Sequence, residues 1–312
     1  VGALLFPALL AGGYNERYSL GLVTTSGSLG LLLAPSLPLI LYGVIAQQMD
    51  LPAPFSLRDL FLAGAIPALL MILSLSVYSV WVTKDLALVR EQFDGAEGLI
   101  QFQELKWDMP LPFIVLGGIY SGFFAVSEAA AVTSAYVVLV YVFVKKEVNL
   151  SSVPRIVKES MMMVGGILLI LGVSLAFTNY LIDAEVPQAL FSWINEFVKS
   201  KVAFLLLLNV VLLLLGAILD IFSALVIMVP LILPLAISYG VDPVHLGIIF
   251  LANMQIGYFT PPIGMNLFIA SYRFKKPISE VYLATLPFMG VLLIVLALIT
   301  YLPEISLFFL DR

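Results

Sequence analysis

The chain has 312 residues, of which 62% are hydrophobic and 11% are charged, and its formal net charge at pH 7 is −5. This composition is far more apolar than that of soluble domains, and the few charges are spread over connecting segments, which excludes nucleic acid as a partner. The chain contains no cysteine, which excludes disulfides and thiolate metal sites.

The chain begins at Val1 inside an apolar segment that we interpret as the second arm of a helical pair. It has neither an initiator methionine nor a signal-like basic region at this point. We therefore expect an N-terminal part of the protein to precede Val1.

Long apolar segments then follow one another along the chain, and most reach the ~20 helical residues that cross a hydrocarbon core. They lack the alternation of apolar and polar residues found in membrane barrels, so helices must satisfy the backbone hydrogen bonds. The predicted fold class is an all-α integral membrane protein spanning a lipid bilayer several times. Its apolar segments are 18–48, 58–83, 111–144, 159–182, 202–238, 243–272 and 283–303.

Two parts of the sequence match when the chain is shifted by 227 residues. Each part holds an apolar helix ending near a proline, a short polar turn, and a spanning segment interrupted by Gly-x-x-x-x-Pro. Four such matches could arise by chance, but their order and context favour a true repeat. The matching pairs are Pro7 with Pro234, Gly13 with Gly240, Gly30 with Gly257, and Pro35 with Pro262.

Glycine and proline at this spacing predict a break in each spanning helix, because proline lacks an N–H and glycine tolerates unusual dihedral angles. A pair of interrupted segments at matching positions indicates the ion and substrate site of a transporter. The alternative is that these residues only kink packed helices. Hydroxyl and amide side chains beside both breaks favour the first interpretation: Thr24, Thr25, Ser26, Ser28 and Ser36, then Asn253, Gln255, Thr260 and Asn266.

Basic residues indicate which loops face the cytoplasm. They gather in two loops, with Lys145, Lys146, Arg155 and Lys158 in one and Arg273, Lys275 and Lys276 in the other. If both loops are inside, segment 202–238 begins and ends outside and is a re-entrant hairpin, while 111–144 crosses twice and turns near Ser121 to Ser127. The two broken segments then run in opposite directions, so the repeats are inverted, as alternating-access transporters commonly require.

The predicted organisation follows from this topology. Residues 1–83 are the remainder of the first inverted repeat, comprising a hairpin return arm, a broken helix and a following helix. Residues 84–110 form a cytoplasmic amphipathic linker. Residues 111–312 form the second repeat, with scaffold helices at 111–182, an outer amphipathic helix at 186–199, the re-entrant hairpin at 202–238, the broken helix at 243–272 and a last helix at 283–303.

Three ionisable residues stand out in or beside apolar segments. Asp220 separates two long apolar helices, where it is expected to cap the second helix, to face a cation, or both. Glu128 lies in the first turn of a helix whose dipole favours a negative charge. His245, the only histidine, begins a helix near the outer edge and is interpreted as an interfacial residue.

The sequence resembles the large membrane subunit of the tripartite ATP-independent periplasmic (TRAP) transporters. The resemblance covers essentially the whole chain. It rests on SGSLGLLLAPSLPLILYGV (26–44), LGGIYSGFFAVSEAAAV (116–132), LGAILDIFSALVIMVPLILPLA (215–236) and GVDPVHLGIIFLANMQIGYFTPPIGMNLFIAS (240–271).

The resemblance implies an elevator-type, multi-pass protein of the bacterial inner membrane that imports a small carboxylate with Na⁺ as the coupling ion. It also implies two partners, a small membrane subunit and a periplasmic substrate-binding protein. Expected sodium ligands, mainly backbone oxygens, are Gly30, Leu33 and Pro35 in one site and Asp220, Gly257, Thr260 and Pro262 in the other. Expected substrate-binding residues are Thr25, Ser26, Ser223, Asn253 and Asn266.

Two other functions remain open at this point. A channel or pore would also use unwound backbone carbonyls, although inverted repeats are unusual there. A membrane-embedded enzyme is disfavoured, because the sequence lacks paired carboxylates, a nucleophile with its base, or a metal motif at membrane depth.

Overall fold

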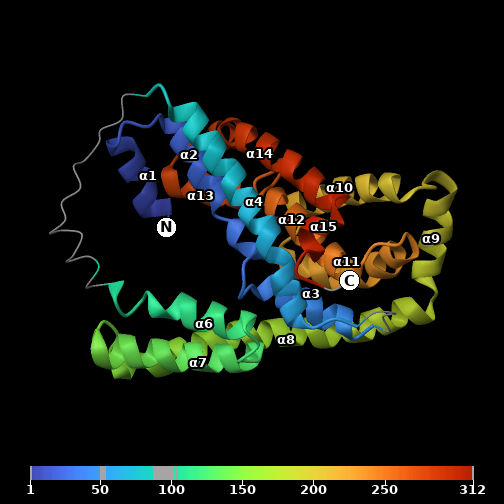
Figure 1. Cartoon of the computed structure of the whole chain (residues 1–312), viewed down its shortest axis with the longest axis horizontal. Coiled ribbons are helices and arrows are strands. Elements are labelled where there is room, and N and C mark those ends of the chain that lie inside the picture. Colours follow the sequence, from blue (N-terminus) through green and yellow to red (C-terminus); the bar gives the residue numbers. More distant parts are fainter. Residues whose placement is uncertain (1, 50–53, 87–101, 103–104, 311–312) are drawn as a thin grey trace. The chain divides into compact units, whose positions relative to one another are not determined.

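The computed structural model describes residues 2–49, 54–86, 102 and 105–310, and this part of the chain forms helices and loops without a strand. The chain divides into two compact units (Figure 1): residues 1–90 with 178–312, and residues 91–177. Among the described residues, six helical segments are long and apolar enough to cross a membrane. The predicted all-α membrane fold is confirmed.

The first part of the larger unit contains the first predicted broken helix. Its elements are α1 (Gly2–Ala11), α2 (Glu16–Ser26), the 3-10 helix η1 (Leu29–Leu32), α3 (Leu37–Gln47) and α4 (Leu57–Thr83). Polar residues set the helix starts: Asn15 caps α2, Ser36 caps α3, and Ser56 with Asp59 forms a capping box on α4.

The second part of the larger unit contains the second broken helix. Its elements are α9 (Val186–Phe197), α10 (Lys201–Ile218), α11 (Ile221–Ser238), α12 (Pro243–Gly257), α13 (Met265–Phe274), α14 (Ile278–Tyr301) and the short α15 (Pro303–Leu307). Every residue of α12 is buried, so this helix is the centre of the unit.

Helices α10 and α11 form the predicted hairpin at 202–238. At its base the rings of Phe204 and Tyr239 stack with centroids 4.4 Å apart, and Lys201 donates a hydrogen bond of 2.7 Å to the carbonyl of Gly240. At its tip, Leu219 and Asp220 separate the two helices. Two helices that meet at Asp220 thus occupy the segment that the sequence predicts as a re-entrant hairpin.

The two parts of the larger unit pack in a reciprocal way. Helix α2 packs on α14 while its counterpart α12 packs on α4, and α3 packs on α11 while Phe274 of α13 meets Phe6 of α1 at 4.4 Å. Such exchanged contacts are what a two-fold relation between repeats produces. Ser28, near that axis, donates a 3.1 Å hydrogen bond to the carbonyl of Gln255, which is its equivalent 227 residues later.

The smaller unit is a helical hairpin followed by a long helix. It contains α6 (Pro110–Tyr120), α7 (Val126–Val138), the π-helix η2 (Leu139–Val144), the 3-10 helix η3 (Leu150–Ser152) and most of α8 (Val153–Asp183), whose end belongs to the larger unit. The turn between α6 and α7 lies where it was predicted. However, α6 has 11 residues, about 16 Å at 1.5 Å per residue, which is shorter than a hydrocarbon core.

Two polar clusters hold this unit together. Glu128 accepts a 2.9 Å hydrogen bond from the N–H of Ala125, which confirms its expected place in the first turn of α7. Asp108 accepts hydrogen bonds from Lys145 at 2.6 Å and from Tyr141 at 2.8 Å, and the bond from Lys145 lowers the pKa of the Asp108 carboxyl. Most of the predicted linker at 84–110 lies outside the described residues.

Candidate functional site

The hairpin tip lies directly against the second helix break. The N–H of Ile221, at the start of α11, donates a 3.0 Å hydrogen bond to the hydroxyl of Tyr258, and the N–H of Gly264 donates one of 2.9 Å to the carbonyl of Ala217. These two bonds join both arms of the tip to the two ends of the break.

Asp220 is the N-cap of α11. One carboxylate oxygen accepts the N–H groups of Phe222 and Ser223 at 3.0 Å each, and the other accepts the hydroxyl of Ser223. The predicted capping role is confirmed, and it fixes the carboxylate at the hairpin tip. Ser223, an expected substrate-binding residue, therefore lies at the same tip.

Two glycines allow the tip to approach the break closely. A Cβ atom on Gly257 would lie 2.6 Å from the backbone carbonyl carbon of Gly216, so α12 has no room for a side chain at this crossing. A Cβ atom on Gly216 would lie 3.1 Å from the Cα of Gly257, which is a tight contact. The glycine of the predicted break is therefore required for packing as well as for breaking the helix.

The second break runs from the end of α12 at Gly257 to the start of α13 at Met265. The carbonyl of Gly257 accepts the N–H of Thr260 at 2.9 Å, and the Thr260 hydroxyl donates to the carbonyl of Ile256 at 2.8 Å. The carbonyl of Pro262 accepts the hydroxyl of Tyr282. Hard oxygen atoms are thus concentrated in this break.

The first break contains the same turn. The carbonyl of Gly30 accepts the N–H of Leu33 at 3.2 Å, as Gly257 accepts Thr260. The peptide bond before Pro35 is cis, as is the one before Pro262. Gly27 to Ser36 separates α2 from α3, with η1 between them, so both predicted breaks interrupt their helices.

The expected substrate-binding residues do not gather in one cavity. Thr25 and Asn253 are fully buried, and the Asn253 side chain donates a 2.6 Å hydrogen bond to Asn209 of α10. Ser26 lies at the end of α2, bonded to its own helix through the carbonyl of Val23, and Asn266 begins α13.

A chain of buried polar side chains continues from Asn253 through the larger unit. Asn209 donates to the Thr300 hydroxyl at 3.1 Å, the Thr300 carbonyl lies 3.3 Å from one ring nitrogen of His245, and the other ring nitrogen lies 3.1 Å from the Ser306 hydroxyl. His245 is 1% exposed. The interfacial interpretation of His245 is wrong, because α14 and α15 cover the first turn of α12.

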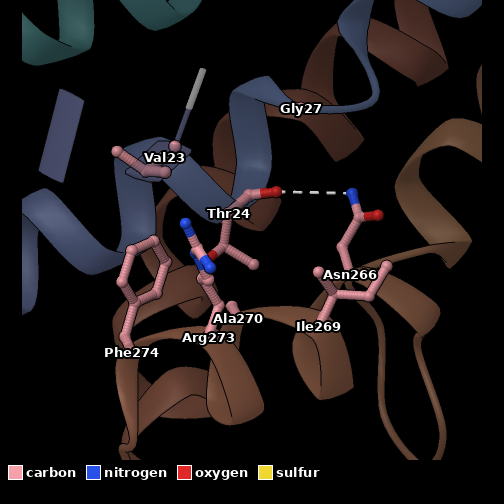
Figure 2. A pocket seen from close by; sticks show the side chains of 9 residues that line it. Val23, Thr24, Gly27, Asn266, Ile269, Ala270, Arg273 and Phe274 are labelled. Carbon is pink, nitrogen blue, oxygen red and sulfur yellow. Dashed lines mark hydrogen bonds between the residues drawn. The ribbon is translucent and has the colours of Figure 1, made fainter. Parts of the chain in front are cut away.

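A cavity of about 340 Å³ lies between α1, α2 and α13. Figure 2 shows that Asn266 and Arg273 reach into it from α13 and face Thr24 of α2. The Asn266 amide donates a 3.4 Å hydrogen bond to the Thr24 carbonyl. The remaining walls are mainly apolar and consist of Gly2, Val23, Gly27, Ile269, Ala270 and Phe274.

Sequence reasoning selected only Asn266 of these cavity residues for substrate binding. In the sequence Arg273 indicates only the charge of the following loop, although its position seven residues after Asn266 predicts that the two share one face of α13. Thr24 was noted beside the first break, but nothing in the sequence distinguished it from Thr25, which is fully buried.

Comparison with known proteins gives a consistent assignment. Residues 1–305 match the family described as "Tripartite ATP-independent periplasmic transporter, DctM component". The chain is 35% identical to the C4-dicarboxylate TRAP transporter large permease protein DctM of Pseudomonas aeruginosa, over 98% of this chain and 70% of that protein.

Two other relatives have different substrates in their names. The isethionate TRAP transporter permease protein DctMQ of Oleidesulfovibrio alaskensis is 36% identical over 99% of this chain and 48% of that protein. The sialic acid TRAP transporter large permease protein SiaM of Vibrio cholerae is 33% identical over 98% of this chain and 70% of that protein. The chain belongs to the DctM component family of the tripartite ATP-independent periplasmic transporters, and it is a multi-pass inner-membrane transport protein rather than an enzyme.

Proposed function

We propose that this chain imports a small organic carboxylate by sodium-coupled secondary transport, with an elevator-type movement of the bundle that holds the hairpin and the broken helices. The substrate is delivered by a periplasmic substrate-binding protein, and a small membrane subunit completes the transporter. The observation that carries this proposal is the hairpin tip at Asp220 held against the break between α12 and α13.

The chemistry of the two breaks supports sodium as the transported ion. Sodium is a hard cation that prefers oxygen ligands, and the breaks offer the expected carbonyl and hydroxyl oxygens. A carbonyl oxygen that accepts one turn hydrogen bond, as Gly30 and Gly257 do, keeps a second lone pair for a cation. The carboxylate of Asp220 at the adjacent tip adds negative charge. We assign Gly30, Leu33 and Pro35 to one sodium site and Asp220, Gly257, Thr260 and Pro262 to the other.

Buried oxygens beside the breaks give further support. Within the described residues, the side-chain oxygens of Thr25, Asn253 and Gln255 are buried without a hydrogen-bond partner. A buried polar atom in that state indicates a water, ion or ligand in the functional protein.

The substrate class follows from the relatives, whose names include a C4-dicarboxylate, isethionate and sialic acid. All three are small organic anions, and bound sodium ions would offset the negative charge of such a substrate in a membrane site. We assign substrate contacts to Thr25, Ser26, Ser223, Asn253 and Asn266 around the breaks.

The test is uptake by the complete transporter reconstituted in proteoliposomes with its binding protein. Labelled succinate, isethionate and sialic acid are offered under an inward sodium gradient. We expect saturable uptake of succinate or sialic acid that requires both sodium and the binding protein, whereas uptake of isethionate alone, a sulfonate without a carboxyl group, would contradict a carboxylate substrate. Equal uptake after sodium is replaced by potassium would contradict sodium coupling. Non-saturable flux without the binding protein would favour a channel.

A further inference from the structure

The cavity between α1, α2 and α13 contains one formal charge, the guanidinium of Arg273 (Figure 2). No described carboxylate lies within ion-pair distance of it. Glu16, in the first turn of the adjacent helix α2, pairs with Lys276 at 2.6 Å and not with Arg273. The positive charge at Arg273 is therefore available for a ligand.

The arrangement of polar groups suits an elongated organic anion. Asn266 and Arg273 are seven residues apart on α13, which places them on one face about 10 Å apart along the helix axis. The Asn266 amide donates its hydrogen bond to the Thr24 carbonyl at one end of this face, and Arg273 lies in the last turn of α13 at the other end. Between them the walls are apolar, so the cavity offers a cationic end, an amide end and an apolar middle.

The size of the cavity is also appropriate. About 340 Å³ lies within the range of small-molecule pockets. A guanidinium presents N–H groups in a planar fork that binds a carboxylate through two parallel hydrogen bonds, which gives both strength and orientation.

The position of Arg273 defines the stage of transport at which it acts. It lies in the last turn of α13, just before Lys275 and Lys276 of the loop whose basic residues predict the cytoplasmic side. The cavity extends from Asn266, at the helix break, to this end of α13.

We propose that Arg273 binds the carboxylate of the substrate at the cytoplasmic mouth of the transport path and so sets the affinity of the inward-facing state for organic anions. This inference rests on the proposed function and adds the residue that receives the anion on the inside. Asn266 orients the other end of the substrate at the break.

The experiment uses the complete transporter in proteoliposomes and measures exchange of labelled substrate between the lumen and the outside. The substrate is succinate or sialic acid, both of which carry a carboxylate, whichever the wild-type transporter takes up. The concentration is varied separately on the cytoplasmic and periplasmic faces. For Arg273→Gln we expect the KM on the cytoplasmic face to rise about 10- to 100-fold, because a charge-assisted bidentate contact is lost. The KM on the binding-protein side should change little.

Two further variants make the result specific. Lys275→Gln removes the same charge from the same loop but does not line the cavity, and it should behave as the wild type. Arg273→Lys keeps the charge but loses the fork, so it should show an intermediate cytoplasmic KM. If the transporter that carries Arg273→Gln does not assemble, the cytoplasmic KM of Arg273→Lys tests the proposal.

The outcomes separate the two proposals. If the wild type shows no sodium-dependent uptake of succinate or sialic acid, the proposed function fails. If the wild type transports but Arg273→Lys has a wild-type cytoplasmic KM, or Arg273→Gln matches Lys275→Gln, the role of Arg273 is overturned.

Discussion

Asp220 has a capping role in the structure and a proposed role as a sodium ligand, and two substitutions can separate them. Its carboxylate caps α11 through the N–H groups of Phe222 and Ser223, and it is also an expected sodium ligand. Asparagine caps a helix about as well as aspartate but carries no charge. The two roles therefore predict different effects of Asp220→Asn and Asp220→Ala.

For Asp220→Asn we expect unchanged thermal stability and an apparent sodium affinity at least ~10-fold weaker, since a charged ligand is replaced by a neutral one. For Asp220→Ala we expect an additional loss of about 1 kcal/mol in stability. Uptake against sodium concentration and a thermal unfolding series measure both. Asp242→Asn, at the N-cap of α12, is the matched control. If Asp220→Asn has a normal sodium dependence, Asp220 does not bind sodium and acts only as a helix cap.

The close packing of α12 against α10 at Gly257 can be tested by substitution. A methyl group there would overlap the backbone of Gly216, whereas one on Gly290 of α14 would meet nothing within 4 Å. We expect Gly257→Ala to destabilise the protein by about 1–3 kcal/mol and to reduce uptake, because the hairpin tip must move away from the break. Gly290→Ala should be neutral or slightly stabilising. Equal unfolding temperatures for the two variants would contradict the close approach.

Residues of the site differ in how far the sequence could place them. Asp220 was predictable because an aspartate between two apolar helices has few structural options. The sequence predicts Arg273 only as a basic residue of the loop after α13, because the direction of its side chain depends on how α13 packs against α2. The contact of Asn253 with Asn209 between α12 and α10 could not be predicted, because no local pattern in the sequence indicates it.

At the scale of elements, the helices and their breaks follow directly from apolar length and from glycine, proline and capping residues. The hairpin arms, the turn after α6 and both breaks lie where they were predicted. The length of α6 was not predictable, because the apolar run continues through residues that form the turn and the start of α7. The burial of His245 could not be predicted, because α15, which covers it, has five residues and is too short to show a helical period in the sequence.

The buried polar chain connects four elements, α10, α12, α14 and α15. Asn209 is its centre, since it accepts from Asn253 at 2.6 Å and donates to Thr300 at 3.1 Å. Asn209→Ala leaves both partners buried without this bond, and we expect a loss of about 1–3 kcal/mol in stability. Asn195→Ala, on the exposed side of α9, is the control and should change stability little. A thermal unfolding comparison that gives the same midpoint for both variants would show that the chain of polar groups adds no stability.

At the scale of the whole molecule, the orientation of the two repeats in the membrane is the central prediction. The reciprocal packing of α2 with α14 and of α12 with α4 agrees with two repeats related by a two-fold axis. The direction of each repeat comes from loop charge: the first broken helix runs outward and the second runs inward. Equivalent residues in the two repeats should then face opposite sides of the membrane.

Gln48 and Lys275 are such a pair, because they are 227 residues apart, follow α3 and α13, and are both exposed. The chain has no cysteine, so a single introduced cysteine is the only thiol in it. We expect Gln48→Cys in intact cells to react with a membrane-impermeant maleimide added outside, once the outer membrane is permeabilised. Lys275→Cys should react only after the inner membrane is opened. Lys199→Cys, after the outer helix α9, should behave like Gln48→Cys. If Gln48 and Lys275 are labelled from the same side, the repeats are parallel, and the alternating-access mechanism built on their inversion fails with them.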